Sequence, residues 1–400
     1  MTIKPHIYVA GTCDTKGPEL RYAADLIDRA GAKALIADVS TTPSGFAADI
    51  SADAIAAFHP EGPAAVLGLS DRGQAVTAMA QAFAQFMLSR NDVAGILGMG
   101  GSGNSTIVSA GMRVLPVGVP KVLVSTLASG NVAGFVGASD IMMMHSVADI
   151  AGLNAITRKV IGNAAHAIAG MAMNALPATA SDKPAIGFTM FGVTTACVSQ
   201  MRQALESQFE CFVFHATGIG GQCMEKLIDS RHLKAAIDMT TTEVADYIVG
   251  GILPCTDDRF GSVIRTEIPY AGSVGALDMV NFGARDSVPE RFSGRKFHVH
   301  NASVTLMRTT AEENAAIGAW IVERLNRMRG PVRFLLPLGG ISAIDAPGQP
   351  FHDQDADAAL FDAIRSGWKP AGNRRLIEFD DHIDNQAFAA AAVSAFREIM

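Results

Sequence analysis

The sequence predicts an α/β protein built from mostly parallel sheets with helices on both faces. Short apolar strands alternate with amphipathic helices early in the chain, and the same alternation starts again after residue 184. Hydrophobic residues make up 49% of the 400 residues and charged residues 18%, a balance that supports large buried cores. We therefore expect two domains, 1–178 and 184–400, separated at the segment 177–184, which contains two prolines.

The first domain is expected to consist of βα units. Pro18 suits the first position of a helix that ends near Ala30, and Gly31 closes this helix. Residues 41–70 are rich in Ala, Pro, Ser and Gly and fit no regular pattern. The expected strands are 7–10, 34–39, 93–97 and 122–126, and the other expected helices are 71–90, 106–112 and 154–176.

The second domain repeats this plan. Its expected strands are 185–191, 211–215, 235–239, 332–337 and 376–379. Four helices are expected in this domain. Two of them end near residues 207 and 228, and the other two span 312–328 and 386–399. Residues 251–310 contain many glycines and several short strand candidates, so they stay unassigned.

The charge balance and the cysteines limit the classes of function. The net charge of −7 and the lack of a basic run argue against a nucleic-acid or membrane-surface partner. The five cysteines are scattered without a C-x-x-C pair, which indicates a reducing compartment. The sequence shows no signal peptide and no uninterrupted apolar 18-mer, so we expect a cytoplasmic protein.

The most informative motif is the glycine-rich loop 98–105, Gly-Met-Gly-Gly-Ser-Gly-Asn-Ser, between a predicted strand and a predicted helix. Glycines let backbone N–H groups approach a phosphate, and a helix N-terminus adds about half a positive charge. The alternative is that the glycines only make a tight turn. The candidate phosphate-binding residues here are Gly100, Gly101, Ser102, Gly103, Asn104 and Ser105.

Two phosphate-binding patterns each match this loop in part. Gly98, Gly100 and Gly103 give G-x-G-x-x-G, but the next strand lacks the acidic residue that an NAD site uses to hold the ribose. Residues 98–105 also give G-x-x-x-x-G-x-S, but Asn104 stands where a P-loop has lysine. A dinucleotide redox role is therefore disfavoured, whereas phosphate binding remains the leading hypothesis.

A second polar loop, 11–17, follows the first predicted strand. Lys16 can supply the positive charge that Asn104 does not, and Asp14 can hold a ribose hydroxyl or a hydrated magnesium ion. The alternative is that Asp14 or Thr15 only caps the helix. The candidate binding residues are Gly11, Thr12, Asp14, Thr15 and Lys16, together with Asp38 near the end of the next strand.

Polar residues also follow other predicted strands, where an open α/β sheet binds its ligands. Ser125 and Thr126 join the candidate binding residues. The weak catalytic candidates are His145, Asp149, His215 and Asp238. His145 lies in an apolar segment and is more typical of a packing residue than of a base. His215 opens a second glycine-rich loop, His-Ala-Thr-Gly-Ile-Gly-Gly, which is a further possible anion site.

Metal and hydrolase sites have weaker support. His298 and His300 share one face of a strand candidate, a spacing that can suit a metal, but the sequence offers no third ligand, so we predict no metal site. Asp257-Asp258-Arg259 fits either a surface turn or a site pair. The run Asp353, Asp355 and Asp357 is typical of a solvated helix start. The chain contains neither G-x-S-x-G nor H-E-x-x-H.

Several long motifs together resemble one family. They are Gly-Thr-Cys-Asp-Thr-Lys-Gly at 11–17, the loop 98–105, Phe-His-Ala-Thr-Gly-Ile-Gly-Gly at 214–221, Asp-Met-Thr-Thr-Thr-Glu-Val-Ala-Asp at 238–246, the stretch 273–283 and the stretch 340–351. Over nearly its whole length the chain resembles an uncharacterised family of bacterial proteins that also includes the ATP-binding domain of the tomato protein conferring resistance to tomato mosaic virus.

The resemblance implies a fold and a ligand but no reaction. It implies two Rossmann-like subdomains, a homodimer, and ATP as the ligand, with or without Mg²⁺. The antiviral role of the plant protein is not expected to transfer to a bacterial-type chain. If ATP binds the first subdomain, the loop 98–105 is the natural phosphate cradle, with the loop 11–17 beside it.

Three hypotheses about function stay open. The first is a nucleotide-binding protein that holds ATP on its N-terminal loops. The second is an enzyme that acts on a small phosphorylated or carboxylic metabolite between the two domains, which His215, Asp238 and Asp257-Asp258 favour. The third is an interaction module without a working ligand site. Replacing Gly101 and His215 in turn would separate the first two hypotheses.

Overall fold

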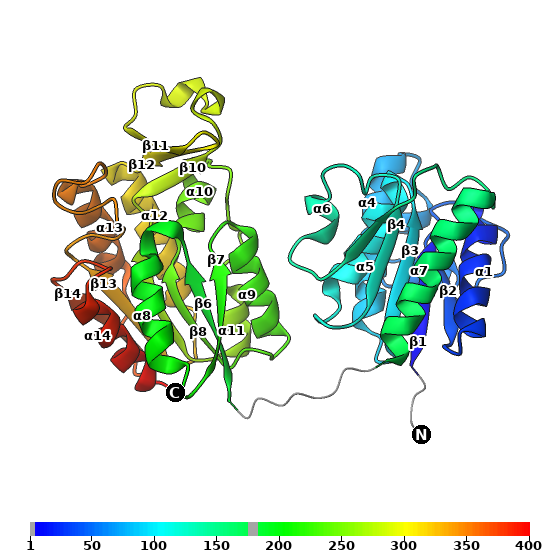
Figure 1. Cartoon of the computed structure of the whole chain (residues 1–400), viewed down its shortest axis with the longest axis horizontal. Helices are drawn as coiled ribbons and strands as arrows, with labels where there is room; N and C mark the ends of the chain where they lie inside the picture. Colours follow the sequence, from blue (N-terminus) through cyan, green and yellow to red (C-terminus); the bar gives the residue numbers. More distant parts are fainter. Residues whose placement is uncertain (1–4, 175–182) are drawn as a thin grey trace. The chain divides into compact units, whose positions relative to one another are not determined.

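A computed structural model describes residues 5–174 and 183–400 of the chain. The chain divides into two compact units, which we call unit 1 (residues 1–179) and unit 2 (residues 180–400). Most of the expected boundary segment, residues 177–182, lies outside the described residues. Each unit is a parallel sheet between two layers of helices, so the predicted α/β class with two Rossmann-like subdomains is confirmed (Figure 1).

Unit 1 has a five-stranded parallel sheet in the order β2-β1-β3-β4-β5. Its strands are β1 (His6–Gly11), β2 (Ala34–Asp38), β3 (Val93–Gly100), β4 (Lys121–Ser125) and β5 (Met142–His145). Its helices are α1 (Cys13–Arg29), α2 (Ala52–Ala56), α3 (Ala64–Leu67), α4 (Arg72–Leu88), α5 (Ser102–Val114), α6 (Ala133–Val136) and α7 (Ala155–Met173). The expected strands and long helices are present, and α2 and α3 lie in the stretch that fitted no pattern.

The two faces of this sheet are covered by different helix pairs. Apolar residues of α1 and α7 form one core cluster with the sheet, and those of α4 and α5 form another. Helix α4 begins where the sequence predicts, because the Asp71 side chain accepts a hydrogen bond from the Gln74 amide at 2.8 Å. Helices α4 and α5 approach closely at Gly111, where a Cβ atom would meet the ring of Phe83.

Two predicted helix starts in unit 1 are wrong. Helix α1 begins at Cys13 and not at Pro18, so most of the predicted loop 11–17 is helical. The amides of Cys13 and Asp14 donate to Asp38 Oδ1 and Ser40 Oγ, both at 3.1 Å, and these acceptors come from the end of the next strand. Helix α5 begins at Ser102, before the predicted Thr106. Local sequence cannot reveal a cap that a distant strand supplies.

Unit 2 has a six-stranded parallel sheet in the order β14-β13-β9-β8-β6-β7. Its strands are β6 (Ala185–Met190), β7 (Glu210–His215), β8 (Ala235–Thr240), β9 (Tyr270–Gly275), β13 (Val332–Pro337) and β14 (Arg374–Phe379). Helices α8 (Thr195–Leu205) and α14 (Gln386–Arg397) pack on one face. The other face carries α9 (Ile219–Asp229), α10 (Thr242–Val249), α11 (Gly261–Thr266), α12 (Ala311–Leu325) and α13 (Gln354–Gly367).

The unassigned stretch 251–310 contains α11, strand β9 and a small antiparallel sheet. That sheet has the order β10-β12-β11, with β10 (Met279–Phe282), β11 (Phe297–Asn301) and β12 (Val304–Arg308). Short 3-10 helices at Arg285–Ser287 and Glu290–Phe292 connect β10 to β11, and one at Gly192–Thr194 follows β6. In Figure 1 the small sheet stands at the top of unit 2.

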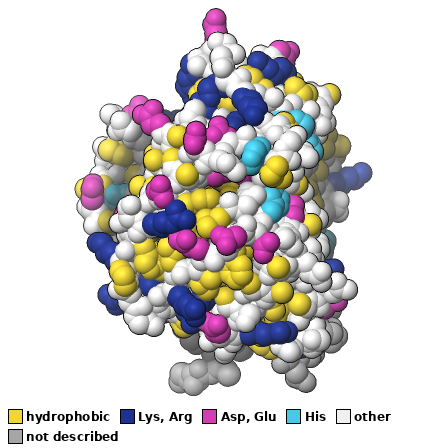
Figure 2. Space-filling view, turned by 90° about the vertical axis from the view of Figure 1, so that its left-hand side faces the viewer, with side chains coloured by type: hydrophobic (Ala, Val, Ile, Leu, Met, Phe, Trp, Pro, Cys, Tyr) yellow, Lys and Arg dark blue, Asp and Glu magenta, His cyan; other side chains and the backbone are white. Residues whose placement is uncertain are grey.

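Among the described helices, none is both long and apolar enough to cross a membrane. On the face of the molecule that Figure 2 shows, Lys and Arg side chains are interspersed with Asp and Glu side chains and form no continuous basic surface.

Candidate functional site

The strand order of unit 1 defines where a ligand can bind. Strands β1 and β3 are neighbours although β2 separates them in the chain. The helix that follows β1 packs on one face of the sheet, and the helix that follows β3 packs on the other. Connections that leave in opposite directions open a crevice at the carboxyl ends of the strands, which is the usual ligand position in doubly wound sheets.

A cavity of about 520 Å³ opens at this position. Eight predicted binding residues line it: Thr12, Asp14, Thr15 and Lys16 from the start of α1, and Gly101, Ser102, Gly103 and Asn104 from the start of α5. Asp149, a weak catalytic candidate, also lines it, whereas His145 is not among its lining residues. The fold thus brings together two loops that lie far apart in the sequence.

The remaining predicted residues lie beside the cavity and do not line it. Ser105 and Ser125 share a hydrogen bond between their hydroxyls at 2.8 Å, and the amide of Thr126 donates to the carbonyl of Gly100 at 3.3 Å. Gly100 has a φ of +154° and lies against Asn104, so a side chain there would be strained. Gly11 packs against Leu20. These contacts shape the two loops.

Asn104 holds the two loops together. Its Oδ1 accepts a hydrogen bond from the Thr12 amide at 3.1 Å, and its Nδ2 donates to the Met99 carbonyl at 2.7 Å. Both ends of the side-chain amide are therefore used inside the protein. The residue that replaces the P-loop lysine thus fixes the geometry of the cavity wall.

The two helix N-termini at the cavity differ in what satisfies their amides. At α1, Asp38 Oδ1 accepts from the Cys13 amide, and Asp38 also accepts from the hydroxyl of Ser44 at 2.8 Å. Asp38 is 3% exposed and serves as an internal anion for this helix. At α5, no side chain caps the helix, and within the described residues no group accepts from the amides of Ser102, Gly103 or Asn104.

Charged side chains line the same cavity as the open α5 N-terminus. Lys16 and Arg72 both line the cavity, and neither has an ion-pair partner among the described residues. Asp14 accepts a hydrogen bond from the Thr42 hydroxyl at 2.6 Å. Burial and the neighbouring Asp38 raise the pKa of the Cys13 thiol, so this cysteine is not a thiolate at neutral pH.

Sequence reasoning missed several lining residues. Arg72 is the first residue of α4, and Thr41, Thr42, Leu69 and Ser70 come from the stretch that fitted no pattern. One signal was available: Arg72 directly follows Asp71, the predicted first residue of a helix in a strand-to-helix connection. The apolar wall of Leu69, Val76 and Ile107 had no sequence signature, because Val76 and Ile107 also fit ordinary helix patterns and Leu69 lies in the unassigned stretch.

The second glycine-rich loop, after β7, contrasts with the first. Glu243 Oε1 accepts hydrogen bonds from the amides of Gly218 and Gly221, at 2.8 and 3.0 Å. Glu243 is fully buried, and a Cβ atom on Gly221 would meet its carboxylate. A carboxylate of the protein itself thus occupies the position where an anion would bind. His215 is exposed and packs edge-on against Phe191 with ring centroids 5.2 Å apart.

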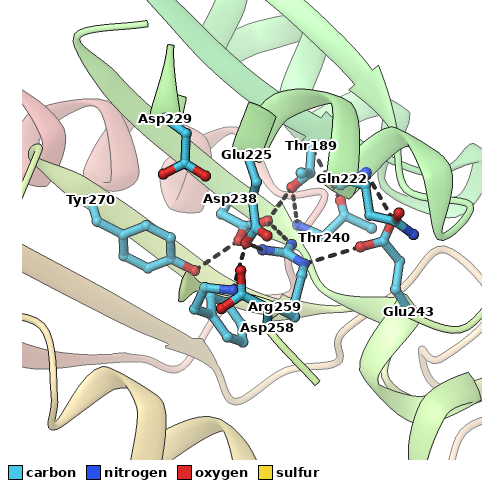
Figure 3. A network of polar contacts seen from close by, with 12 residues as sticks. Thr189, Gln222, Glu225, Asp229, Asp238, Thr240, Glu243, Asp258, Arg259 and Tyr270 are labelled. Carbon is cyan, nitrogen blue, oxygen red and sulfur yellow. Dashed lines mark hydrogen bonds and ion pairs between the residues drawn. The ribbon is translucent and has the colours of Figure 1, made fainter. Parts of the chain in front are cut away.

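A buried charge network lies behind this loop (Figure 3). The Arg259 guanidinium contacts Asp238, Glu243 and Glu225, at 2.9, 3.1 and 3.2 Å. Asp238 also accepts hydrogen bonds from Thr189 at 2.6 Å and Tyr270 at 3.0 Å, so both of its oxygens are used. These contacts favour a structural role for Asp238.

The network carries more negative than positive groups, which shifts several pKa values. Burial raises the pKa of Glu225 to about 7, although Arg259 and the amide of Phe260 oppose the shift. Burial also raises the pKa of Glu243. For Arg259, burial lowers the pKa, but the three carboxylates outweigh it and hold the pKa well above its usual value. The guanidinium therefore stays charged.

The other sequence candidates are dispersed. His298 and His300 have ring centroids 6.5 Å apart, and within the described residues no group of three or more His, Cys, Asp or Glu side chains could hold a metal ion. Asp353 caps α13 by accepting from the Ala356 amide at 3.1 Å, as predicted for a helix start. Asp357 differs from that prediction, because it is buried and paired with Arg308 at 2.7 Å.

Comparison with known proteins gives the family. The N-terminal domain of "Uncharacterised protein family (UPF0261)" matches residues 5–177, and the C-terminal domain of the same family matches residues 183–400. The chain belongs to this family. The resemblance expected from the sequence motifs is therefore confirmed.

Relatives extend from bacteria to a plant. A UPF0261 protein of Rhizobium meliloti (strain 1021) is 55% identical over 393 residues, which cover 98% of both chains. A UPF0261 protein of Clostridium tetani is 41% identical over 402 residues, again with 98% of both chains covered. The ToMV resistance protein Tm-1(GCR237) of Solanum lycopersicum is 38% identical over 420 residues, which cover 99% of this chain and 56% of the tomato protein.

Proposed function

We propose that unit 1 binds ATP, with its phosphates at the N-terminus of α5. The observation that carries the proposal is that this helix has no cap among the described residues, although it opens onto a cavity at the switch point of the sheet. Free helix amides and the helix dipole together favour a phosphate group. The neighbouring N-terminus of α1 is already satisfied by Asp38, so it offers less to an anion.

The residues around the cavity fit the other parts of a nucleotide. Lys16 and Arg72 supply positive charge for phosphates, and Asp14 and Asp149 supply carboxylates for a ribose hydroxyl or for Mg²⁺. Leu69, Val76 and Ile107 supply an apolar wall for the base. A cavity of about 520 Å³ falls within the usual range for small-molecule sites. Asp14 and Asp149 would hold Mg²⁺ if it binds with the nucleotide, and the ion would then neutralise part of the phosphate charge.

The test is calorimetric titration of the full chain with ATP, with and without Mg²⁺, and with ADP and NAD as comparisons. In wild type we expect ATP binding with a Kd on the order of 1–100 µM. Gly101→Val should weaken it by at least about 100-fold, since its side chain would project where the phosphates bind. The fold should survive, because a Cβ atom at Gly101 meets only Thr126 Oγ1, at 3.8 Å.

Two matched variants control this test. Gly134→Val changes a glycine of α6 that has open space around it and lies outside the cavity, so it should leave ATP binding unchanged. Lys16→Met should weaken ATP binding about tenfold, whereas Lys33→Met, at an exposed lysine away from the cavity, should not. If wild type binds no nucleotide, or if Gly101→Val and Gly134→Val behave alike, the proposal fails and small phosphorylated or carboxylic acids become the next ligands to test.

Two expectations from the sequence stay predictions beside this proposal. One is the homodimer that the family resemblance implies, which light scattering of the purified chain would test. The other is the cytoplasmic location.

A further inference from the structure

The sheet of unit 2 has a switch point of its own, between β6 and β8. These strands are neighbours although β7 separates them in the chain. Helix α8, which follows β6, packs on one face of the sheet, and α10, which follows β8, packs on the other. Doubly wound sheets bind their ligands at such a position. In unit 1 a cavity opens there, whereas in unit 2 the hydroxyls of Thr194, after β6, and Thr240, at the end of β8, share a hydrogen bond at 2.8 Å.

The loop 338–353, which connects β13 to α13, lies over this position and contains the family motif 340–351. The amide of Ala343 donates to the carbonyl of Val193, which follows β6, at 2.8 Å. Phe351 is fully buried and belongs to one core cluster with Val193 and Ala276, the residue that directly follows β9. The loop therefore covers the carboxyl ends of β6 and β9, which lie on either side of β8.

Three buried carboxyl groups and one guanidinium hold this loop in place. Asp345 belongs to the loop, Asp278 follows β9 and Asp357 belongs to α13; the first two are fully buried and the third is 6% exposed. Arg308 Nη2 lies 2.7 Å from Asp357 Oδ1 and 3.8 Å from Asp345 Oδ1. Asp278 Oδ2 accepts from the hydroxyl of Ser342, a loop residue, at 2.7 Å. If all three carboxyl groups are ionised, their charge exceeds that of the guanidinium.

Two oxygens of this cluster lack a donor. Asp278 Oδ1 and Asp345 Oδ1 have no hydrogen-bond partner among the residues that the structure describes. Two imidazoles lie close by: His352 Nδ1 is 3.9 Å from Asp345 Oδ1, and His382 Nε2 shares a hydrogen bond with the Ser342 carbonyl at 2.8 Å. Burying an ionised carboxylate oxygen without a donor is costly, and protonation of the carboxyl group removes much of this cost. The closed loop therefore favours protonated carboxyl groups.

The shifts in pKa agree with this geometry. Burial raises the pKa of Asp278 to about 7; the charge of Asp345 adds to the shift and Arg308 opposes it. Burial also raises the pKa of Asp357 to about 8, although Arg308 opposes the shift. An open loop would return these groups to water, where the pKa of an Asp is about 4. The closed loop thus binds more protons than the open loop between about pH 4 and pH 8, and a rise in pH over this range favours opening.

We propose that the loop 338–353 is a proton-controlled lid over the switch point of the unit 2 sheet. The lid is closed while Asp278 and Asp357 hold protons. As these protons pass to the solvent, the carboxylates repel one another and the lid opens, which uncovers the carboxyl ends of β6 and β9. Every residue of the lid and its latch lies in unit 2, so the proposal does not depend on the nucleotide site proposed for unit 1.

Hydrogen exchange of the full chain, followed by mass spectrometry from pH 5 to pH 8, tests the lid. Dividing the intrinsic exchange rate at each pH by the measured rate gives a protection factor for the loop. We expect this factor to fall at least about 100-fold from pH 5 to pH 8, because a carboxyl group with a pKa near 7 changes the opening equilibrium about tenfold per pH unit below that value. The loop should also exchange faster than the central strand β8 at every pH, since a lid opens without unfolding the sheet.

Asparagine variants connect this pH dependence to the cluster. Asp278→Asn keeps an acceptor for the Ser342 hydroxyl but carries no charge, so at pH 8 the loop should be protected at least about tenfold more than in wild type. Asp357→Asn, which keeps an acceptor for Arg308, should act in the same direction and decides the test if the first variant does not fold. Asp353→Asn is the matched control, because the exposed Asp353 side chain caps α13 and asparagine caps a helix equally well.

Three results would overturn the proposal. The first is a protection factor of the wild-type loop that does not change with pH. The second is a loop that exchanges no faster than β8, which would mean that the loop opens only when unit 2 unfolds. The third is that the asparagine variants at Asp278 and Asp357 keep the same pH dependence as Asp353→Asn.

Discussion

Two glycine-rich loops of this chain each connect a strand to a helix, β3 to α5 in unit 1 and β7 to α9 in unit 2. They differ in what their backbone amides contact. In unit 1, the amides at the start of α5 face a cavity and have no acceptor within the described residues. In unit 2, the amides of Gly218 and Gly221 donate to the buried carboxylate of Glu243. Both loops suggest an anion site by sequence, but only the first has room for an external anion.

The difference depends on a side chain that the motif does not contain. Glu243 comes from the start of α10, after a different strand, and Arg259 compensates its charge. Asp38 plays the same part for α1 in unit 1. An internal carboxylate stabilises a helix N-terminus by the same electrostatics that bind a phosphate, so the two uses compete. A glycine loop therefore indicates an anion position without saying which anion fills it.

The largest expected effect concerns Arg259, the cation that balances the charge of Glu243 at the glycine-rich loop after β7. Arg259→Met should lower the free energy of unfolding of unit 2 by about 3–5 kcal/mol, because three buried carboxylates lose their shared partner. Denaturant unfolding followed by tryptophan fluorescence reports on unit 2 alone, since Trp320 and Trp368 are the two tryptophans of the chain.

Arg265→Met is the matched control for this measurement. Arg265 also contacts two carboxylates, Asp229 and Asp258, but its side chain is 49% exposed. Exposed ion pairs contribute about 0–1 kcal/mol, so this variant should unfold nearly as wild type does. If both arginine variants lower the free energy of unfolding equally, burial is not what makes Arg259 essential to unit 2.

The next effect is on pH dependence, where the two units should differ in sign. In unit 2, burial raises the pKa of Glu225, Asp246 and Asp278 to about 7 and of Asp357 to about 8. The folded unit thus binds more protons than the unfolded chain between about pH 4 and these values. Its free energy of unfolding should fall by about 3 kcal/mol or more from pH 5 to pH 8.

Unit 1 should show the opposite trend. Burial raises the pKa of Asp140, but its contacts with Lys121 and the Gly118 amide outweigh this and lower it. The stability that this carboxylate contributes is present near neutral pH and is lost as the pH falls below its ordinary value, near 4. Calorimetric unfolding between pH 3 and pH 8 would resolve the two units. A unit 2 that becomes more stable toward pH 8 would contradict the raised pKa values.

The smallest expected effect comes from a variant that should make the loop after β7 resemble the loop 98–105, by leaving its amides without an internal acceptor. Glu243→Ala removes the internal anion and should destabilise unit 2 by about 2 kcal/mol, because the amides of Gly218 and Gly221 and the Arg259 guanidinium lose an acceptor. Sulfate should bind the vacated position and restore part of this loss. Tryptophan-detected unfolding of wild type and variant, in sodium sulfate and in sodium chloride of equal ionic strength, measures both quantities. If sulfate stabilises the variant no more than wild type, the amides do not form an anion site.

Much of the fold could be predicted from the residues. Strand β13 has the predicted bounds, and β1, β4, β6, β7 and β8 agree within one or two residues, because buried parallel strands are short apolar runs between turn residues. The stretch 251–310 could not be assigned, because its strands β10 and β11 are short and gain their stability from the antiparallel partner β12.

The candidate site was predictable only in part. The loops 11–17 and 98–105 were recognisable, since glycine and hydroxyl residues at strand ends have a direct physical meaning in an α/β sheet. Leu69 was not, because nothing local distinguishes a cavity residue from an ordinary surface residue, and Arg72 had only its place after the helix cap Asp71 as a signal. Asp38 was chosen as a ligand residue for its place at a strand end, but in the fold its carboxylate holds α1.

The sequence by itself determined the α/β class and the family, because periodicity and long motifs are properties of neighbouring residues. Only the tertiary structure decided which glycine loop stays open, since Asp38 and Glu243 reach their helices from other strand ends. It also decided that Asn104 joins two loops. These are contacts between residues far apart in the chain, and the hydrogen bonds that define them exist only once the sheets have formed.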